Sequence, residues 1–222
     1  MSLHLPPRSF RDNYRWPFDP DGRVHPMRAR YEFYPTPPEA TRALLSVESF
    51  DGSIWEPACG QGHISRVLEA AGHEVVSTDL IERDYGRGGV DFLRQARPRA
   101  RHIITNPPYG RGLGDAFVKH ALDLTRETGG SVAMLLNLAS LCHPKRHELW
   151  VNHPPAVIYA LDELTCWPEG DPERAGRFTG THRYCWAVWK TRSHRAVSAV
   201  VAEHAGVLRI TLTRPRVVVA RW

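Results

Sequence analysis

Residues 53–62 read Ser-Ile-Trp-Glu-Pro-Ala-Cys-Gly-Gln-Gly, and the fold is decided around them. The apolar start predicts a short strand over 53–55, and residues 64–71 predict a helix that ends at Gly72. Glycines between a strand and a helix let the backbone turn sharply and approach a ligand closely. A plain tight turn uses glycines in the same way, so a ligand site here needs support from other residues.

Strands and helices alternate along the chain that surrounds this loop. We predict further strands over 74–78, 90–92, 102–105, 131–138, 156–161 and 184–190, and helices over 37–46, 115–127 and 147–151. Residues 131–138 are almost all apolar, which is typical of a strand at the centre of a parallel sheet. The alternation predicts an α/β fold with a single doubly wound, mostly parallel sheet and an antiparallel edge strand.

Two segments flank this alternation. Near its start, Thr36 is expected to cap the first helix, with Pro37 at the first helical position. In the tail we expect a helix over 196–204 and strands over 207–213 and 217–220. The sequence therefore divides into an N-terminal arm (1–34), a central α/β domain (35–190) and a basic C-terminal extension (191–222) that packs on the core.

The composition is that of one globular domain. The chain has 222 residues, of which 42% are hydrophobic and 24% are charged, so disordered, collagen-like and coiled-coil classes are excluded. No apolar run reaches the roughly 18–20 residues of a membrane span, and residues 1–11 contain no apolar signal region. The 4 cysteines include no Cys-x-x-Cys pair. We therefore expect a cytoplasmic protein without a zinc ribbon or a disulfide scaffold.

The charge is positive and concentrated in arginine. The formal net charge is +5, and only Lys119, Lys145 and Lys190 are lysines among 29 basic residues. Arginine binds phosphate and stacks on bases, although a biased genomic base composition enriches arginine as well. The candidate phosphate contacts, whose alternative is a solvated basic surface, are Arg8, Arg11, Arg15, Arg28, Arg30, Arg192, Arg195, Arg209, Arg214, Arg216 and Arg221.

Acidic residues follow two of the predicted strands. Asp79 ends the strand over 74–78, where a carboxylate can reach the ribose hydroxyls of a nucleoside. Asp91 and Phe92 end the next predicted strand, where an acid can accept from an adenine amino group and an aromatic ring can stack on it. Each residue alone reads as a surface acid or a core phenylalanine. Together with the glycine loop, they predict a nucleoside-containing ligand at one rim of the sheet.

The most specific motif is Asn106-Pro107-Pro108-Tyr109, which follows the apolar strand over 102–105. Both prolines present carbonyl oxygens without a competing N–H. The Asn106 side-chain oxygen and the Pro107 carbonyl can together accept both hydrogens of one planar amino group. Tyr109 offers a ring that can stack on a planar substrate. The motif predicts a site that holds an NH₂ group with its lone pair free to attack.

At these residues the sequence resembles class I S-adenosylmethionine-dependent methyltransferases. More narrowly, it is similar to gamma-ordered DNA N6-adenine methyltransferases and their small phage- and prophage-encoded members. The shared order is a Thr-Pro-Pro helix start, a Glu-Pro-x-Cys-Gly loop, acidic strand ends and then Asn-Pro-Pro-Tyr. The resemblance covers residues 31–190 and implies a Rossmann-like fold, with 35–190 as the catalytic domain. It also implies the cofactor S-adenosyl-L-methionine, and no metal.

The resemblance assigns roles to individual residues. The implied catalytic residues, which grip the target amino group and stack on the target base, are Asn106, Pro107, Pro108 and Tyr109. The implied cofactor-binding residues are Thr36, Glu56, Pro57, Cys59, Gly60, Gly62, Asp79, Asp91, Phe92 and Asn106. The expected partner is duplex DNA with a flipped base. RNA bases, cytosine N4, protein glutamine and a non-catalytic nucleic-acid-binding role stay open, as do a monomer and a homodimer.

Overall fold

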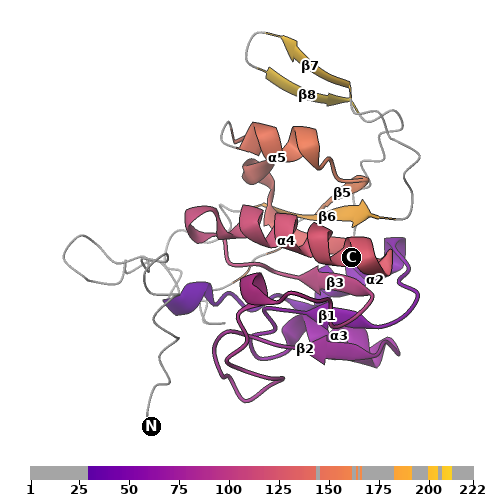
Figure 1. The fold of residues 1–222 in the computed structure, drawn as a ribbon, viewed down its shortest axis with the longest axis vertical. Coiled ribbons are helices and arrows are strands. Elements are labelled where there is room, and N and C mark those ends of the chain that lie inside the picture. Colours follow the sequence, from indigo (N-terminus) through magenta and orange to yellow (C-terminus); the bar gives the residue numbers. More distant parts are fainter. Residues whose placement is uncertain are drawn as a thin grey trace, which may run out of the picture.

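The computed structural model describes residues 30–143, 146–161, 164, 166, 183–191, 200–204 and 207–211. Six of the strands join one sheet, and helices alternate with them along the chain (Figure 1). These strands are β1 (Ile54–Glu56), β2 (Val75–Ser77), β3 (His102–Thr105), β4 (Ser131–Asn137), β5 (Val157–Ala160) and β6 (Tyr184–Lys190). The α-helices are α2 (Pro38–Val47), α3 (His63–Ala70), α4 (Leu113–Thr128) and α5 (His147–Asn152).

The sheet is mostly parallel, as the sequence predicts. Its strand order is β2-β1-β3-β4-β6-β5, and β1 pairs in parallel with both β2 and β3, while β3 pairs in parallel with β4. Strand β6 is antiparallel to both of its neighbours, β4 and β5. The predicted antiparallel pairing at one edge is confirmed, and the reversed strand lies one place inside that edge.

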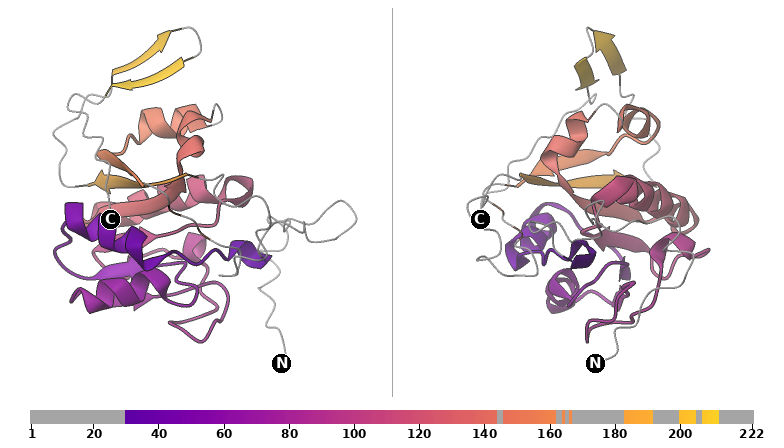
Figure 2. Two further views of the ribbon diagram at one scale, coloured as in Figure 1. Left: turned by 180° about the vertical axis from the view of Figure 1, so that it is seen from behind. Right: turned by 90° about the vertical axis from the view of Figure 1, so that its left-hand side faces the viewer.

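Helices cover both faces of the sheet, which makes the fold doubly wound (Figure 2). Residues of α2 and α3 pack in one core cluster, and residues of α4 and α5 pack in the other. Strand β4 contributes to both clusters because successive side chains point to opposite faces. Its Ala133 and Leu135 lie in the first cluster, whereas Val132 and Met134 lie in the second.

Strand β6 ties the two layers of helices to the sheet. All of its residues except Lys190 are buried. The Trp186 indole N–H donates to the carbonyl oxygen of Ala40 in α2 at 2.8 Å. On the opposite face, the Trp189 indole N–H donates to the His153 carbonyl oxygen, directly after α5, at 2.9 Å. Each of these two tryptophans of β6 therefore bonds to a different one of the two helical layers.

The predicted strand over 90–92 is wrong. The Asp91 side chain accepts a hydrogen bond from the Leu93 N–H at 3.0 Å and caps a 3-10 turn, η2 (Phe92–Arg94). An aspartate that bonds its own following backbone competes with strand pairing. The chain before it still follows the sheet, because the Val90 N–H donates to the Asp79 carbonyl oxygen at 2.9 Å.

The predicted helix over 196–204 is wrong for its described part. Residues Val200–His204 form strand β7, which pairs antiparallel with β8 (Val207–Thr211) in a separate two-stranded sheet (Figure 1). The β-branched Val200 and Val201 suit this extended state. The expected strand over 217–220, most of the arm, and the arginines at 8, 11, 15, 28, 192, 195, 214, 216 and 221 lie outside the described residues.

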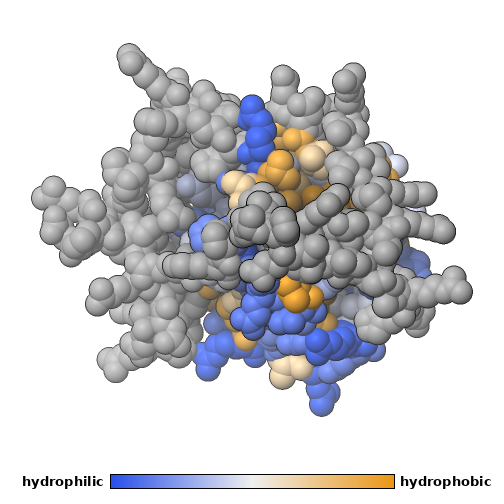
Figure 3. Space-filling view, turned by 90° about the horizontal axis from the view of Figure 1, so that it is seen from above, coloured by the Kyte–Doolittle hydropathy of each residue, from blue (hydrophilic) through white to orange (hydrophobic). Residues whose placement is uncertain are grey.

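The described surface carries little exposed large hydrophobic area. Among the described side chains of residues 31–191, Val151 is the one large hydrophobic side chain that is exposed. Seen from above, the described surface shows hydrophilic residues alongside smaller hydrophobic areas (Figure 3). In the same described part, no helix is both long and apolar enough to span a membrane.

We expect Gly130 to tolerate no side chain. A Cβ at this position would overlap the Arg101 carbonyl oxygen, whereas a Cβ at Gly114 in α4 would lie 3.7 Å from the Pro108 carbonyl oxygen, an ordinary contact. Gly130→Ala should lower the free energy of unfolding by about 2–3 kcal/mol through overpacking. Gly114→Ala should raise it by about 0.5–1 kcal/mol because alanine favours a helix. Urea unfolding measures both changes, and equal midpoints for the two variants would contradict this packing.

Candidate functional site

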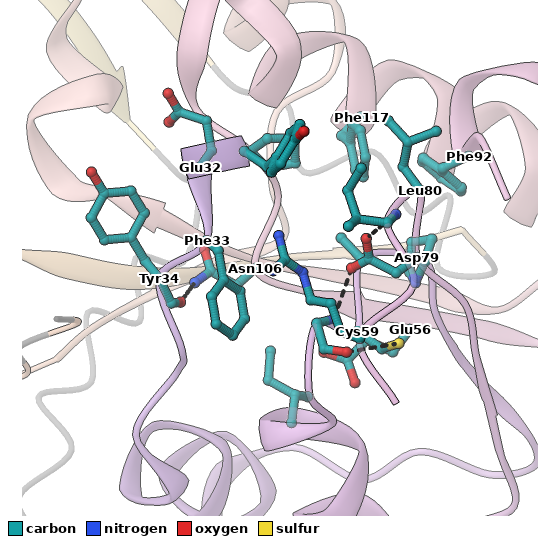
Figure 4. A pocket seen from close by; sticks show the side chains of 18 of the residues that line it. Glu32, Phe33, Tyr34, Glu56, Cys59, Asp79, Leu80, Phe92, Asn106 and Phe117 are labelled. Atoms are coloured by element: carbon teal, nitrogen blue, oxygen red, sulfur yellow. Dashed lines mark hydrogen bonds between the residues drawn. The ribbon is translucent and has the colours of Figure 1, made fainter. Parts of the chain in front are cut away.

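A cavity lies at the carboxyl ends of β1, β2 and β3, where parallel strands end at the same edge. The space free of protein atoms in the cavity and at its open mouth is about 900 Å³. Figure 4 shows side chains from several of these chain segments directed toward it. The predicted site residues that line it are Thr36, Glu56, Pro57, Cys59, Gly60, Asp79, Asp91, Phe92, Asn106 and Pro108. Gly62, Pro107 and Tyr109 are not among the lining residues.

The loop after β1 needs both of its glycines. Gly60 and Gly62 have φ angles of 54° and 82°, in the left-handed region that favours glycine. A Cβ at Gly60 would lie 2.7 Å from the Phe33 ring, and a Cβ at Gly62 would overlap the Tyr85 ring. Gly62 thus packs against the Tyr85 ring directly before α3, whereas Gly60 lines the cavity. The sequence prediction of a sharp turn at this loop is confirmed.

Asp79 joins the ends of β1 and β2. Its two carboxylate oxygens accept hydrogen bonds of 2.8 Å each, one from the Gly60 N–H and the other from the Ile81 N–H. Burial raises the pKa of Asp79, and the two backbone donors oppose this shift. The carboxylate therefore holds the glycine loop against the next strand and still borders the cavity (Figure 4).

Glu56 is a buried carboxyl group at the end of β1. It is 2% exposed. Its Oε2 accepts hydrogen bonds from the Ser65 N–H at 2.8 Å and from the Ser65 hydroxyl. Burial raises the pKa of Glu56 to about 8, although both bonds from Ser65 lower it. Neighbouring Cys59 is also buried, which raises the pKa of its thiol and keeps it protonated.

Asp91 and Phe92 shape the cavity from η2. The Phe92 ring is 2% exposed and packs edge-on against Trp55, with ring centroids 5.1 Å apart. It also contacts Phe117 of α4, at a centroid distance of 4.7 Å. Both phenylalanines line the cavity. The 3-10 turn thus brings an acid and an aromatic wall to the position where the sequence predicted them, although no strand carries them.

The loop after β3 holds the predicted amino-group acceptor. Asn106 and Pro108 line the cavity. The Tyr109 hydroxyl lies 2.5 Å from Asn106 Oδ1 and 2.9 Å from the Leu135 carbonyl oxygen. Its single hydrogen bonds one of these two acceptors at a time. The Tyr109 ring packs against both core clusters. In this arrangement the tyrosine is directed at Asn106 and the core.

Thr36 does not cap the first helix, contrary to the sequence prediction. The N-cap is Pro37 and helix α2 begins at Pro38, with no side-chain hydrogen bond at the cap. The Thr36 hydroxyl instead accepts a hydrogen bond of 3.0 Å from Asn106 Nδ2. Since two prolines follow it, no free N–H is available for a threonine cap at the next two positions. The Thr36 hydroxyl bonds to the Asn106 amide instead.

Residues 31–35 form a wall of the cavity, although none of them is among the predicted site residues. Tyr31 and Glu32 have φ angles of 59° and 56°, which are rare for residues with a side chain and often occur at functional sites. The Arg83 guanidinium lies 4.2 Å from the centroid of the Phe33 ring and completes this wall. The signal was present: the aromatic-rich stretch Tyr-Glu-Phe-Tyr at residues 31–34 is separated from Thr36 only by Pro35.

The cavity is electrostatically suited to a cation. Its lining residues include the carboxyl groups of Glu32, Glu56, Asp79 and Asp91, and a single arginine, Arg83. A cation that enters such a site favours the ionised forms of Glu56 and Asp79, whose pKa values burial raises. Within the described part of the chain, no group of three or more His, Cys, Asp or Glu residues is arranged to hold a metal.

Solved structures share this architecture. A "putative RNA methyltransferase" from Pyrococcus horikoshii has a TM-score of 0.54 and 13% identity, over 72% of this chain and 87% of that one. The chain has a Rossmann-like methyltransferase fold. A modification subunit of a "putative type I restriction enzyme" from Vibrio vulnificus has a TM-score of 0.46 and 16% identity, over 72% and 45% of the two chains.

A third similar structure is TrmN from Thermus thermophilus, with a TM-score of 0.41 and 19% identity, over 69% of this chain and 48% of that one. No protein-family model matches the sequence, and no curated protein matches it. The methyltransferase fold therefore comes from the arrangement of the chain, and the chemistry of the cavity has to be argued from its own residues.

We expect Glu56 to make folding pH-dependent. Its pKa is 4.5 in the unfolded chain and about 8 in the fold, so the fold binds this proton more tightly. The stability it contributes is complete below pH 4.5 and is lost as the pH rises through 8. Glu56→Gln, which stays neutral, should show a smaller fall in melting temperature across this window than the unmodified chain.

The control for this prediction is Glu39→Gln on α2, whose side chain is 52% exposed. Its melting temperature should follow that of the unmodified chain at every pH. Melting curves recorded by circular dichroism between pH 5 and pH 8 make the comparison. A Glu56→Gln curve that runs parallel to the unmodified one would show that Glu56 titrates as an ordinary carboxyl group.

Proposed function

We propose that this chain is an S-adenosylmethionine-dependent methyltransferase that methylates the exocyclic N6 amino group of adenine in DNA. The observation that carries the proposal is the position of Asn106 beside the acidic strand-end cavity. Its Oδ1 is a hydrogen-bond acceptor whose protein donor is a tyrosine hydroxyl. A hydrogen-bond donor of the substrate, such as an amino group, can replace that hydroxyl.

The residues present fit S-adenosylmethionine. That cofactor carries an ammonium, a carboxylate and a sulfonium, so its net charge is positive and it matches the carboxyl groups of the cavity. The absence of a side chain at Gly60 lets the Phe33 ring close over the glycine loop, so an aromatic wall stands beside the proposed position of the methionine end. In the proposal, Glu56 and the glycine loop hold that end, Asp79 binds the ribose, and Asp91 with Phe92 binds the adenine.

The chain's own contribution to catalysis is positioning and electrostatics. S-adenosylmethionine supplies the methyl group as an electrophile on a sulfonium sulfur. Asn106 Oδ1 and the Pro107 carbonyl oxygen accept the two hydrogens of the target amino group, which leaves its lone pair directed at the cofactor. To receive the base, Tyr109 has to move its hydroxyl from Asn106 Oδ1, after which its ring is free to stack on the base.

DNA is the proposed substrate for two reasons. The net charge of +5 and the predominance of arginine favour a nucleic-acid partner over a protein. The order of the Thr-Pro-Pro, Glu-Pro-Ala-Cys-Gly and Asn-Pro-Pro-Tyr motifs is that of gamma-ordered DNA adenine enzymes. An adenine inside a duplex has to be flipped to reach a cavity of this kind.

A methyl-transfer assay with radiolabelled S-adenosylmethionine tests the proposal. Duplex DNA, single-stranded DNA, total RNA and cell protein are offered in parallel, and nucleoside mass spectrometry identifies the product. Label in N6-methyladenine of DNA is the expected result. Label in cytosine N4, RNA or protein glutamine would keep the reaction and change the substrate. Cofactor binding without transfer to any of them would favour a non-catalytic nucleic-acid-binding protein, and absence of cofactor binding would refute the enzyme.

We expect Asn106→Ala to lose methyl transfer and retain cofactor binding. The variant removes the acceptor for the target amino group, and the loss of one such positioned group costs about 100-fold or more in kcat. Calorimetric titration with S-adenosylmethionine should give a Kd close to that of the unmodified chain. Asn152→Ala, at an exposed position at the end of α5, is the control and should alter neither property. Equal loss of binding and transfer in Asn106→Ala would place Asn106 in the cofactor site alone.

A further inference from the structure

Asn106 is held by two segments that are distant in sequence. Its Nδ2 donates to the Thr36 hydroxyl oxygen at 3.0 Å and to the Tyr34 carbonyl oxygen at 3.3 Å. An amide nitrogen has two hydrogens, so these two bonds use both of them. Its Oδ1 faces the Tyr109 hydroxyl on the other side. Both amide hydrogens of Asn106 therefore bond to the segment that precedes α2.

We propose that Thr36 is a positioning residue, which together with the Tyr34 carbonyl holds the Asn106 amide so that its oxygen, and not its nitrogen, is presented to the substrate. This inference rests on the proposed function, because it concerns the same amino-group site. It differs from the role implied by the family resemblance, which places Thr36 at the methionine end of the cofactor.

The direction of the amide is set by the chemistry of its neighbours. The Tyr34 carbonyl has no hydrogen, so only the amide nitrogen can bond to it. If the amide were rotated by 180°, Oδ1 would face that carbonyl oxygen, and two acceptors would oppose each other. The Thr36 hydroxyl provides the second acceptor, and the residue as a whole is 3% exposed, so water does not readily replace it. A hydroxyl both donates and accepts, so neither Thr36 nor Tyr109 sets the direction alone. The Tyr34 carbonyl sets it, and the Thr36 hydroxyl accepts the second amide hydrogen in that orientation.

The fixed amide has a consequence for the substrate. A site that presents only Oδ1 accepts hydrogens and therefore selects groups that carry N–H, such as the amino groups of adenine and cytosine. A carbonyl oxygen at the same place, as in guanine or uracil, would oppose Oδ1 and leave buried acceptors unpaired. Thr36 thus contributes to the choice of an amino group over a carbonyl through its bond to Asn106.

The test compares Thr36→Val, Thr36→Ser and a matched control. Valine keeps the shape of threonine and removes the acceptor, whereas serine retains the hydroxyl. The control is Thr41→Val in α2, because the Thr41 hydroxyl is buried and has no hydrogen-bond partner in the structure. Melting temperatures establish that each variant is folded before its activity is measured.

Kinetics and cofactor binding separate positioning from cofactor contact. Thr36→Val should lower kcat for methyl transfer about tenfold, the effect of one lost hydrogen bond, and leave the Kd for S-adenosylmethionine within about twofold. Thr36→Ser should restore kcat, and Thr41→Val should match the unmodified chain. Thr36→Val with an unchanged kcat, or with a Kd weakened as much as kcat, would overturn the inference.

A second measurement is independent of catalysis. In ¹⁵N-labelled full-length protein, the Asn106 side-chain NH₂ signals are assigned by their loss in Asn106→Ala. We expect slow hydrogen exchange at this group in the unmodified chain and in Thr41→Val, and faster exchange in Thr36→Val. Equal exchange in all three refutes the hydrogen bond, whether or not the chain transfers methyl groups. If the unmodified chain transfers methyl to no substrate while exchange changes as expected, the proposed function fails and the Thr36–Asn106 bond stands.

Discussion

The parallel pairing of β1 with both β2 and β3 is the constraint on which the site depends. Parallel strands bring their carboxyl ends to one edge, so the residues after each strand meet although they are distant in sequence. Glu56, Asp79 and Asn106 each stand at such an end or within two residues of it. The bond from the Gly60 N–H to Asp79 then closes the gap between the first two loops. Without this pairing the carboxyl groups and the amide would share no cavity.

The cavity concentrates groups that are costly to bury. Glu56 and Asp79 both have raised pKa values because burial disfavours their charged forms. Backbone and serine donors offset part of this cost at both acids. The left-handed backbone at Tyr31 and Glu32 adds local strain in the wall of the same cavity. Buried acids and strain in one place characterise a binding site more than a structural core, and a cationic ligand relieves the electrostatic part.

The segment before α2 has a larger part in the site than its length suggests. Phe33 fills the space over Gly60, and Arg83 covers the other side of the Phe33 ring. Tyr34 and Thr36 bond to Asn106 from the same segment. One stretch of chain therefore touches both halves of the cavity, the glycine loop and the amino-group acceptor. This links the proposed cofactor and substrate positions through direct contacts.

The sequence by itself determined the α/β alternation, the central strand β4, the glycine loop and the Asn-Pro-Pro-Tyr motif, because apolar periodicity, glycine and proline act locally. It pointed to Asp91 and Phe92, which line the cavity, but assigned them a strand, since a side-chain cap outcompeted pairing there. Only the tertiary structure decided the place of the reversed strand β6 between β4 and β5, the bond from Asn106 to Thr36 and the wall formed by residues 31–35. These depend on contacts between segments up to 70 residues apart, and local pattern carries no information about such contacts.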